Sequence, residues 1–417
     1  MSWECKTLEE CTEYITDGDH QPAPKSDEGV LFIKIKDIKE NRIDFKEALH
    51  VPQVYYDGIQ QNRKPVVGDT LYTVVGSYGL SAYVNFDIPF CFERNIALLH
   101  PQKNVDSRFL FYSVSSPDFF KQAENAANGA AQKLIPLSRL KKLKIQLPSL
   151  EIQKKIVDIL SSYDNLIEKN QKQIKLLEEA AQRLYKQWFI DLKFPGHETT
   201  KIVDGLPEGW KKKIVMDFIS QEIGGGWGED DIDQKSSRPA FVIRGADIDG
   251  VNHGDFLNIP FRFHSESNLE QRILLDGDIV FEVSGGSKTE GVAKTLLITT
   301  RLLEQYSSPV ICASFCKKIR PKEGLSQYFY DALQYMRMSG VTSEYDKKSA
   351  SSIVNYRWKD FLSQQCLMLP SENILRMYDK IAKPIYKSIQ TKSIEIEKLK
   401  RARNSLLPKL MSGEIEV

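Results

Sequence analysis

Apolar residues recur at alternating steps of four and three along residues 147–189, in the heptad pattern of a long helix that packs against another helix. Pro148 precedes the run, where proline is tolerated and stops the helix from extending toward the N-terminus. No other proline and no glycine interrupts the pattern before Pro195. At ~1.5 Å per residue, the roughly 40 residues predict a rod of about 60 Å. The positions of this seam include Ile167, Ile174, Leu177 and Leu184.

The same pattern returns at an offset of 222 residues, so the chain itself supplies a second helix of the same kind. The Leu-Pro-Ser sequence that begins at Leu147 is repeated at Leu369, and the seam that follows matches without a gap. Two unrelated amphipathic helices are the alternative, but chance seldom gives an ungapped match behind the same tripeptide. We therefore expect the helical regions 147–195 and 369–417 to pack on each other. The seam of the second region includes Ile389, Ile396, Leu399 and Leu406.

The segment before the first helix has short apolar runs separated by turn residues, which predict a compact α+β domain over residues 1–146. Strands are expected at 30–36, 69–75, 82–86 and 95–99, and a short helix at 109–120. A polar stretch, 196–209, follows the first helical region and is expected to be a linker.

The segment 210–368 repeats the first domain in outline. Trp210 corresponds to Trp3, and Gly277-Asp278 with its following strand corresponds to Gly68-Asp69. The offset drifts from 207 to 222, so the loops differ in length while the helices match without gaps. Two similar scaffolds with two divergent surfaces are typical of a protein that reads two different targets.

Composition limits the classes of function. The chain of 417 residues is long enough for about two to four domains. Its net charge of +1 excludes a globally basic protein, so any contact with nucleic acid must come from local patches. The six cysteines show no disulfide framework, which favours a reducing compartment. No signal peptide and no apolar run of ~18–20 residues is present, so we expect a cytoplasmic protein without a membrane segment.

No motif predicts catalysis or a metal site. Residues 284–289 follow a predicted strand, but they lack the spaced first glycine of a phosphate-binding loop and are interpreted as a turn. Residues 87–90 read Asp-Ile-Pro-Phe, which has isoleucine where the catalytic motif of amino-methyltransferases has proline, and no glycine-rich cofactor loop accompanies them. The six histidines are scattered along the chain. We therefore expect a protein that is not an enzyme and binds no metal.

The combination of these features resembles the specificity (S) subunit of type I restriction–modification enzymes, over essentially the whole chain. The resemblance rests on the duplicated Leu-Pro-Ser helices, on Trp188-Phe189 followed by Phe194-Pro195-Gly196, on the Leu-Pro-Glu-Gly-Trp sequence at 206–210, and on the tail 406–415. It implies two mixed α/β target-recognition domains in tandem pseudo-repeat, separated by two long helices that pack as an antiparallel coiled coil.

The resemblance also implies a function and partners. Each recognition domain would read one half of a bipartite, asymmetric target in double-stranded DNA, with the spacer set by the helices. Half-sites are expected about one helical turn apart, ~34 Å from centre to centre. The helices would dock two methyltransferase subunits, and restriction subunits with endonuclease and translocase activity would join this core. The chain itself would need no cofactor, because the methyltransferase partner would hold S-adenosylmethionine. The exposed sides of the helices, including Trp188 and Phe189, are candidates for methyltransferase docking.

Loops with basic and hydrogen-bonding side chains are the candidates for DNA contact, because phosphate contacts position a protein and base-edge contacts specify the sequence. Any single lysine among them could equally be a solvated surface charge. In the first domain the candidates are Lys34, Lys36, Ser77, Tyr78, Arg94, Asn128, Gln132 and Lys133. In the second domain they are Arg244, Ser287, Lys288, Lys347, Lys348 and Ser349.

Other functions stay open at this point. The chain could be an assembly hub that does not bind DNA, or a specificity subunit that directs methylation without restriction. A self-contained methyltransferase is a further alternative, against which the missing cofactor loop argues. Salt-dependent DNA affinity separates the first alternative from DNA reading, because neutralised phosphates release counterions.

Overall fold

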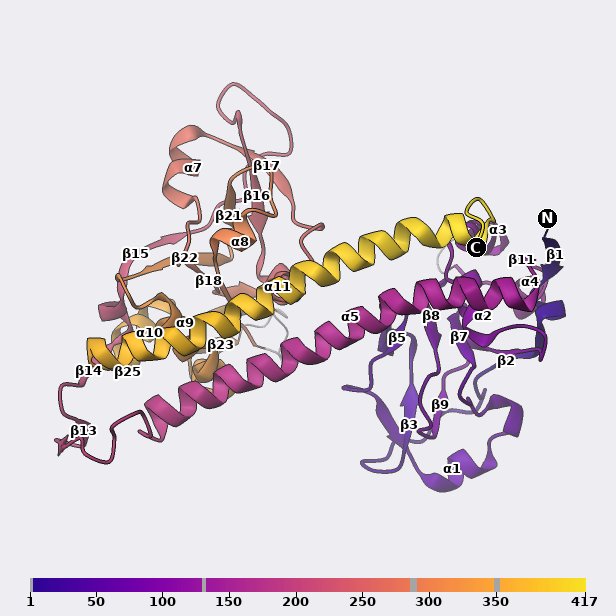
Figure 1. The fold of residues 1–417 in the computed structure, drawn as a ribbon, viewed down its shortest axis with the longest axis horizontal. Helices are drawn as coiled ribbons and strands as arrows, with labels where there is room; N and C mark the ends of the chain where they lie inside the picture. Colours follow the sequence, from indigo (N-terminus) through magenta and orange to yellow (C-terminus); the bar gives the residue numbers. More distant parts are fainter. Residues whose placement is uncertain (1–2, 130–132, 286–290, 349–352) are drawn as a thin grey trace. The chain divides into compact units, whose positions relative to one another are not determined.

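The computed structural model describes residues 3–129, 133–285, 291–348 and 353–417, with only the backbone of Lys348. The chain forms two compact units (Figure 1). Unit 1 contains Met1–Asn165 and Lys400–Val417, and unit 2 contains Leu166–Leu399. Two long helices, α5 (Leu150–Tyr185) and α11 (Glu372–Met411), contribute residues to both units.

Unit 1 is built on a four-stranded antiparallel sheet, in the order β2-β10-β7-β8, and a three-stranded sheet, in the order β6-β3-β9. The strands of the first sheet are β2 (Thr12–Asp17), β7 (Thr70–Thr73), β8 (Ser81–Tyr83) and β10 (Ile96–Pro101). Those of the second are β3 (Val30–Ile33), β6 (Leu49–Val51) and β9 (Phe90–Phe92). Smaller pairs join β1 (Glu4–Thr7) to β11 (Lys144–Leu147) and β4 (Ile38–Lys39) to β5 (Arg42–Ile43).

Several strands of unit 1 end at one edge of these sheets. Asp17 of β2 lies opposite Ala97, and Thr73 of β7 lies opposite Ile96, the first residue of β10. The parallel strands β3 and β9 end together at Ile33 and Phe92. We call this the carboxyl-end edge. The loops that emerge there come from distant parts of the sequence, as expected where parallel strands end side by side.

Short helices cover the sheets of unit 1. They are α1 (Gln53–Gly58), α2 (Ser107–Val114), α3 (Pro117–Ala126) and α4 (Leu137–Leu140). The single helix expected at 109–120 is two helices. Ser116 ends the first segment and caps the second, because its Oγ accepts a hydrogen bond from the backbone N–H of Phe119 at 3.3 Å and Pro117 occupies the first turn.

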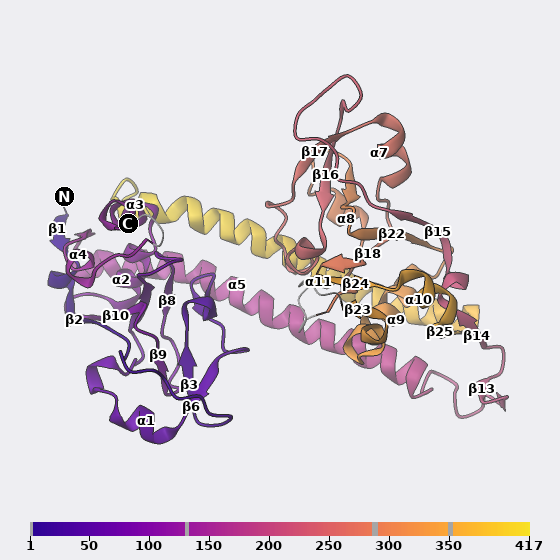
Figure 2. The same ribbon diagram turned by 180° about the vertical axis from the view of Figure 1, so that it is seen from behind.

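Unit 2 repeats this plan. Its four-stranded sheet has the order β15-β22-β18-β20, and one of its three-stranded sheets has the order β17-β16-β21 (Figure 2). The strands of the first are β15 (Ile219–Gly224), β18 (Ile279–Glu282), β20 (Thr295–Leu297) and β22 (Cys316–Pro321). Those of the second are β16 (Arg238–Ile243), β17 (Phe261–His264) and β21 (Val310–Cys312). β14 (Lys211–Ile214) pairs with β25 (Cys366–Leu369).

The carboxyl-end edge recurs in unit 2. Gly224 of β15 lies opposite Lys317, and Glu282 of β18 lies opposite Cys316, the first residue of β22. Ile243 and Cys312 end the parallel strands β16 and β21. A third sheet continues from this edge, formed by β19 (Ser284–Gly285), β23 (Asp346–Lys348) and β24 (Val354–Tyr356).

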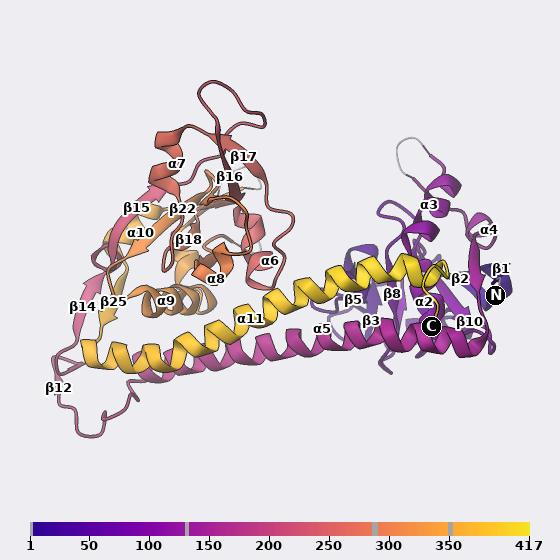
Figure 3. The ribbon, with the colours of Figure 1, turned by 45° about the horizontal axis from the view of Figure 1, so that its top comes forward.

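Short helices pack on the sheets of unit 2, and some of them also contact α11. They are α6 (Ile248–Asn252), α7 (Glu266–Arg272), α8 (Thr300–Leu303), α9 (Ser326–Met338) and α10 (Trp358–Gln364). Figure 3 shows α9 beside α11. The buried carboxyl group of Asp331 in α9 accepts hydrogen bonds from Tyr378 at 2.7 Å and from Tyr386, both in α11. Two short strands, β12 (Ile202–Val203) and β13 (Leu206–Pro207), lie in the segment expected to be a linker.

The two long helices pack on each other within each unit, and the contacts run antiparallel. In unit 1, Ile156 and Leu160 from the start of α5 pack with Leu407 and Leu410 from the end of α11, and the expected seam residue Leu406 packs beside them. In unit 2, Trp188 beyond the end of α5 packs on Tyr378 near the start of α11. Between them a cluster holds the seam residues Ile167, Ile174, Ile389 and Ile396, with Leu177 and Leu399 half-buried against it, while Leu184 packs on the main core of unit 2.

Polar contacts along this helix pair fix its register. Asn170 is buried in the seam, and Lys392 donates a hydrogen bond to Gln173 in unit 2. In unit 1, Nη1 of Arg403 donates to Asp164 at 2.6 Å. Polar groups at seam positions reduce the stability of a coiled coil but select one register and partner. The antiparallel arrangement implied by the resemblance is therefore present.

The six cysteines are free thiols. No helix in the described part of the chain is long and apolar enough to cross a membrane.

Candidate nucleic-acid interface

Glycines let the backbone turn tightly at the carboxyl-end edge of both units. A Cβ on Gly18, which follows β2, would lie 2.1 Å from the carbonyl oxygen of Phe92. A Cβ on Gly225, which follows β15, would lie 2.1 Å from the carbonyl oxygen of Ala313. Any side chain at either position would push the strands apart. The two glycines are therefore equivalent points of the two units.

An arginine fixes each of these turns. Nη1 of Arg63 donates to the carbonyl of Gly18 at 3.3 Å, and its Nη2 lies 3.3 Å from Asp17. In unit 2, Nε of Arg272 donates to the carbonyl of Gly224 at 3.0 Å. The backbone on both turns is thus held in place by side chains from elsewhere in the same unit.

Lys34 and Arg244 occupy the same position in the two units, directly after β3 and β16. The backbone N–H of each donates to an aspartate three residues later, Asp37 or Asp247, at 2.8 Å. The guanidinium of Arg244 also binds Asp247 through Nε at 2.8 Å and Nη2 at 2.7 Å, which holds this side chain in one orientation. The pKa of Arg244 rises because of this hydrogen-bonded pair.

Two further predicted residues of unit 1 lie next to Lys34. Lys36 is exposed, and its Nζ lies 3.5 Å from Glu47. The backbone N–H of Ile35 donates to the Glu93 carboxylate at 2.7 Å, which places the exposed Arg94 beside this turn. Arg94 has no ion-pair partner among the described residues, so its charge is available to a ligand.

Two loops of unit 1 that are far apart in sequence meet at the edge. The N–H of Gly76 donates to the carbonyl of Lys133 at 3.1 Å. The ring of Tyr78 stacks on Phe120 with centroids 5.9 Å apart, and Nζ of Lys133 lies 5.9 Å from the Tyr78 centroid. Ser77 is exposed in the same loop. Asn128 is exposed too, and its Oδ1 accepts a hydrogen bond from Arg139 at 2.6 Å.

In unit 2 the corresponding region is the small sheet of β19, β24 and β23. The exposed Lys347 lies opposite Asn355, and Oγ of Ser284 donates to Oδ1 of Asn355 at 2.8 Å. Lys348 is the last residue of β23. The predicted residues Gln132, Ser287, Lys288 and Ser349 lie outside the described part of the chain.

Beneath this edge of unit 2 lies a buried carboxyl group. Glu282 ends β18 with 2% of its surface exposed, and burial raises its pKa. A Cβ on Gly245 would lie 2.4 Å from its Oε1, so a glycine is required there for the carboxyl group to fit. In unit 1 the matching residue is Thr73, whose hydroxyl donates to the carbonyl of Ser77 at 2.7 Å. The two edges thus share a backbone plan and differ in side-chain chemistry.

The sequence reasoning missed three exposed side chains at these edges. His20 lies after the Gly18 turn, Trp227 lies after the Gly225 turn, and Phe315 lies in the turn from β21 to β22. The run of glycines around Trp227 was a signal in the sequence. Its meaning depends on the pairing of β15 with β22, which lies about a hundred residues away in the chain.

Trp188 and Phe189 were predicted among the exposed docking residues of the helices, and this prediction is wrong. Trp188 is 5% exposed and Phe189 is fully buried. A π-helical turn (Lys186–Ile190) extends α5 and directs both rings into the core of unit 2. There Phe189 packs edge-on against Tyr328 and Tyr378, with centroids 4.8 and 4.9 Å away.

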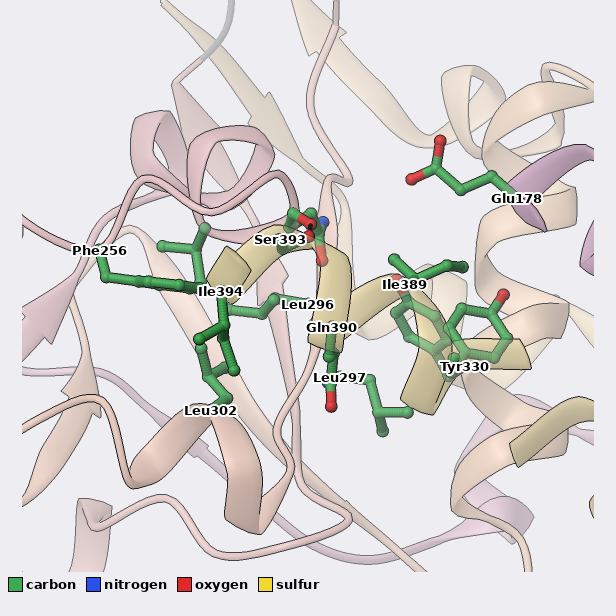
Figure 4. Close-up of a pocket in the computed structure, with 13 residues that line it drawn as sticks. Glu178, Phe256, Leu296, Leu297, Leu302, Tyr330, Ile389, Gln390, Ser393 and Ile394 are labelled. Carbon is green, nitrogen blue, oxygen red and sulfur yellow. Dashed lines mark hydrogen bonds between the residues drawn. The ribbon is translucent and has the colours of Figure 1, made fainter. Parts of the chain in front are cut away.

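One cavity of unit 2, lined partly by residues of α11, is too small to be a ligand site. Figure 4 shows its lining, which includes Leu296, Leu302, Tyr330 and Gln390. Its volume of about 40 Å³ has room for only a few water molecules. No group of three or more potential metal-binding side chains occurs among the described residues. The two edges bring exposed polar, basic and aromatic groups together in each unit.

Known proteins with similar sequences are specificity subunits. The model of the type I restriction modification DNA specificity domain matches residues 2–179. The specificity subunit of the type I restriction enzyme MjaIX from Methanocaldococcus jannaschii is 26% identical over 337 residues, covering 78% of this chain and 72% of the relative. The HindI specificity subunit from Haemophilus influenzae is 24% identical over 445 residues, covering 93% of this chain and 94% of the relative.

A solved structure has the same fold. The crystal structure of the type I restriction–modification S subunit from M. genitalium aligns with a TM-score of 0.58 and covers 99% of this chain and 96% of that one. Sequence identity over this alignment is 15%, so the likeness extends to the architecture and not to individual side chains.

Proposed function

Because the chain belongs to the family of type I restriction–modification specificity subunits, we propose that it selects the DNA target of such a complex by reading a bipartite, asymmetric sequence. The observation that carries this proposal is the pair of carboxyl-end edges. Both are built on corresponding strands and turns, but the side chains at equivalent positions differ: Lys34 corresponds to Arg244, Thr73 to Glu282 and His20 to Trp227. Different side chains on equal scaffolds read different half-sites.

The charges at the edges suit this role. Arg94, Lys133 and Lys347 are exposed cations on otherwise near-neutral units, so they can contact phosphates and set the register on the duplex. Ser77, Asn128 and Asn355 offer exposed donors and acceptors for base edges. Rigid turns hold these groups before binding, which lowers the entropic cost of recognition.

The partners follow from the same proposal. The antiparallel helices form the surface on which two methyltransferase subunits dock, and restriction subunits join the complex in the cytoplasm. The methyltransferase supplies S-adenosylmethionine and the active site, and this chain selects the DNA sequence that is methylated. Because Trp188 and Phe189 are buried, the proposal assigns docking to exposed residues of the helices, such as Leu176 and Ile381.

Methylation mapping tests the proposal. The chain is expressed with a cognate methyltransferase subunit, and modified adenines in the host DNA are located by sequencing. We expect one split, asymmetric motif, with modified adenines in both halves. A stable complex that leaves no motif would refute DNA reading and favour the assembly hub.

A direct binding test uses two residues at opposite ends of β10. Arg94 precedes the strand at the carboxyl-end edge, and the exposed Lys103 follows the strand at the other end. Arg94→Gln should weaken binding and reduce the salt slope of the DNA affinity by about one. Lys103→Gln removes the same charge and should leave both unchanged. Equal effects of the two substitutions would contradict the placement of the interface.

A further inference from the structure

The carboxyl-end edge of unit 2 carries an aromatic side chain that packs on no other ring in the described structure. Phe315 is 60% exposed. Large apolar side chains occur singly on many surfaces, so exposure alone means little. The position of this one is informative, because the turn that carries it joins β21 to β22 at the centre of the edge.

The backbone around Phe315 is held firmly. Its carbonyl accepts hydrogen bonds from the N–H groups of Val283 at 2.9 Å and Ser284 at 3.2 Å. The N–H of Cys316 donates to the carbonyl of Ala313 at 2.8 Å and closes the turn. The ring therefore projects from a fixed base, and little conformational freedom of the backbone is lost when it meets a partner.

Unit 1 has a polar side chain at the same point. The carbonyl of Asn95 accepts from the N–H of Val74 at 2.9 Å, as Phe315 does from Val283, and the N–H of Ile96 donates to Glu93 at 3.1 Å. The turn is thus conserved between the two units while its side chain changes from amide to phenyl. If the fold required a particular side chain in this turn, both units would carry it. We therefore attribute the difference between Asn95 and Phe315 to the different ligands of the two edges.

A second aromatic side chain stands nearby. The N–H of Gly226 donates to the carbonyl of Cys312 at 2.9 Å, which brings the next residue, Trp227, to the same edge. Trp227 is 39% exposed, and the guanidinium carbon of Arg262 lies 4.7 Å from its ring. A cation over one face orients the indole and leaves the rest of its surface for another contact.

We propose that Phe315 is a specificity-determining residue of the second half-site, where its ring makes an apolar contact with base edges, with Trp227 beside it. This inference rests on the proposed function. The chemistry that a phenyl ring recognises in a DNA groove is the methyl group of thymine or the face of a partly unstacked base. The phenyl ring of Phe315 makes no phosphate contact, because it carries no charge.

The test compares Phe315→Ala with Ile202→Ala in the full chain with its methyltransferase. Ile202 is also 60% exposed in unit 2 and lies on β12, outside the edge, so it is a matched loss of exposed apolar surface. We expect Phe315→Ala to relax the methylation motif at one position of one half-site and to lower affinity by about tenfold. The salt slope should stay constant, because no cation is removed. Ile202→Ala should match the parent chain.

Duplex substitution identifies the contact. Once the motif is known, each thymine of the second half-site is replaced by uracil, which lacks the methyl group. If the ring contacts that methyl, uracil weakens the parent chain but not Phe315→Ala. If uracil has no effect while Phe315→Ala still relaxes the motif, the contact is with a base face, and the proposal also stands.

Two results would overturn the inference. One is an unchanged motif and affinity for Phe315→Ala while the parent chain methylates a split motif. The other is an equal loss in Phe315→Ala and Ile202→Ala. If the parent chain gives no motif at all, the proposed function itself has failed, and the two failures are thereby distinguished. Circular dichroism and thermal unfolding of both variants confirm that each is folded.

Discussion

The buried carboxylate of Asp278 accepts two hydrogen bonds from Arg320, from Nε at 2.7 Å and from Nη2 at 2.8 Å. Unit 1 has the same arrangement with a different base: Oδ1 of Asp69 lies 2.6 Å from Nδ1 of His100. Each aspartate precedes a central strand and binds the neighbouring strand near its end. Both units thus have a buried aspartate bound to a basic side chain, an arrangement that we call a latch, at the edge opposite to the carboxyl-end edge.

Removing one partner of the latch should destabilise its unit. Arg320→Ala leaves the Asp278 carboxylate with the N–H of Leu275 and with Lys318, whose Nζ is 3.9 Å away. We expect the free energy of unfolding to fall by about 2–3 kcal/mol. The control Arg238→Ala breaks an exposed pair with Glu266 and should cost less than about 1 kcal/mol. Urea unfolding measures both, and equal values would contradict the latch.

The buried Asp331 predicts a pH dependence of stability. Burial raises its pKa to about 7, against an ordinary value of 3.8. The folded protein therefore keeps a proton that the unfolded chain has lost, and this contribution to stability is complete below pH 3.8 and is lost as the pH rises through 7. The slope is at most about 1.4 kcal/mol per pH unit.

The variant Asp331→Asn isolates this effect, because asparagine does not titrate. The difference in unfolding free energy between the parent chain and Asp331→Asn should change between pH 4 and pH 7 and become constant above pH 8. Urea unfolding at unit intervals of pH provides the measurement. A difference that is flat from pH 4 to pH 8 would show that Asp331 is ionised throughout in the folded protein.

The buried ring of Phe189 predicts a defect in folding and not in docking. Phe189→Ala creates a cavity in the core of unit 2 and should lower the free energy of unfolding by about 3–5 kcal/mol. Leu176→Ala, at a residue of α5 that is 63% exposed, should change it by less than about 0.5 kcal/mol. Thermal and urea unfolding distinguish the variants. Normal stability of Phe189→Ala with lost methyltransferase binding would restore the docking interpretation.

The paired helices predict how the spacer of the target can be changed. Lys392 binds Gln173, so these residues mark equal levels of the two helices in unit 2. Insertion of one heptad beside each of them preserves the seam and lengthens the pair by about 10 Å, or about three base pairs. Methylation mapping should show a spacer longer by that amount with both half-sites unchanged. The same seven residues inserted in α5 alone should disrupt assembly.

The long helices and the duplication were predictable because their signals are local and extended. A heptad repeat needs only neighbouring residues to be recognised, and its recurrence after Leu369 needs only a comparison of the chain with itself. The equivalence of Gly68-Asp69 and Gly277-Asp278 was also visible, and in the structure both aspartates form the latches described above.

Some residue positions could not be predicted from the sequence. They depend on the pairing of strands that are far apart in the chain, or on a local departure from regular helix geometry. His20 and Trp227 reach the carboxyl-end edge through the pairing of β2 with β10 and of β15 with β22. Trp188 falls on the heptad seam, which favours burial, so only its assignment to the exposed docking residues was wrong. Phe189 lies off the seam, and the π-helical turn directs it into the core of unit 2. Lys34, Arg94 and Lys133 were predicted to lie in loops that contact DNA. Only the structure shows that these loops lie at one edge of unit 1, where the strands end.

Two regions that are far apart in the sequence, around Trp3 and around Gly413, meet in unit 1. The ring of Trp3 lies 3.3 Å from the position that a Cβ on Gly413 would take, and Ile415 packs in the same cluster. α5 therefore leaves unit 1 and α11 returns to it, so a peptide link between these two regions would need little rearrangement of the fold. A gene rearranged to begin at the hairpin of β12 and β13 would specify the same contacts in a different order, so the order of the two recognition modules along a gene is free to vary without a change in architecture.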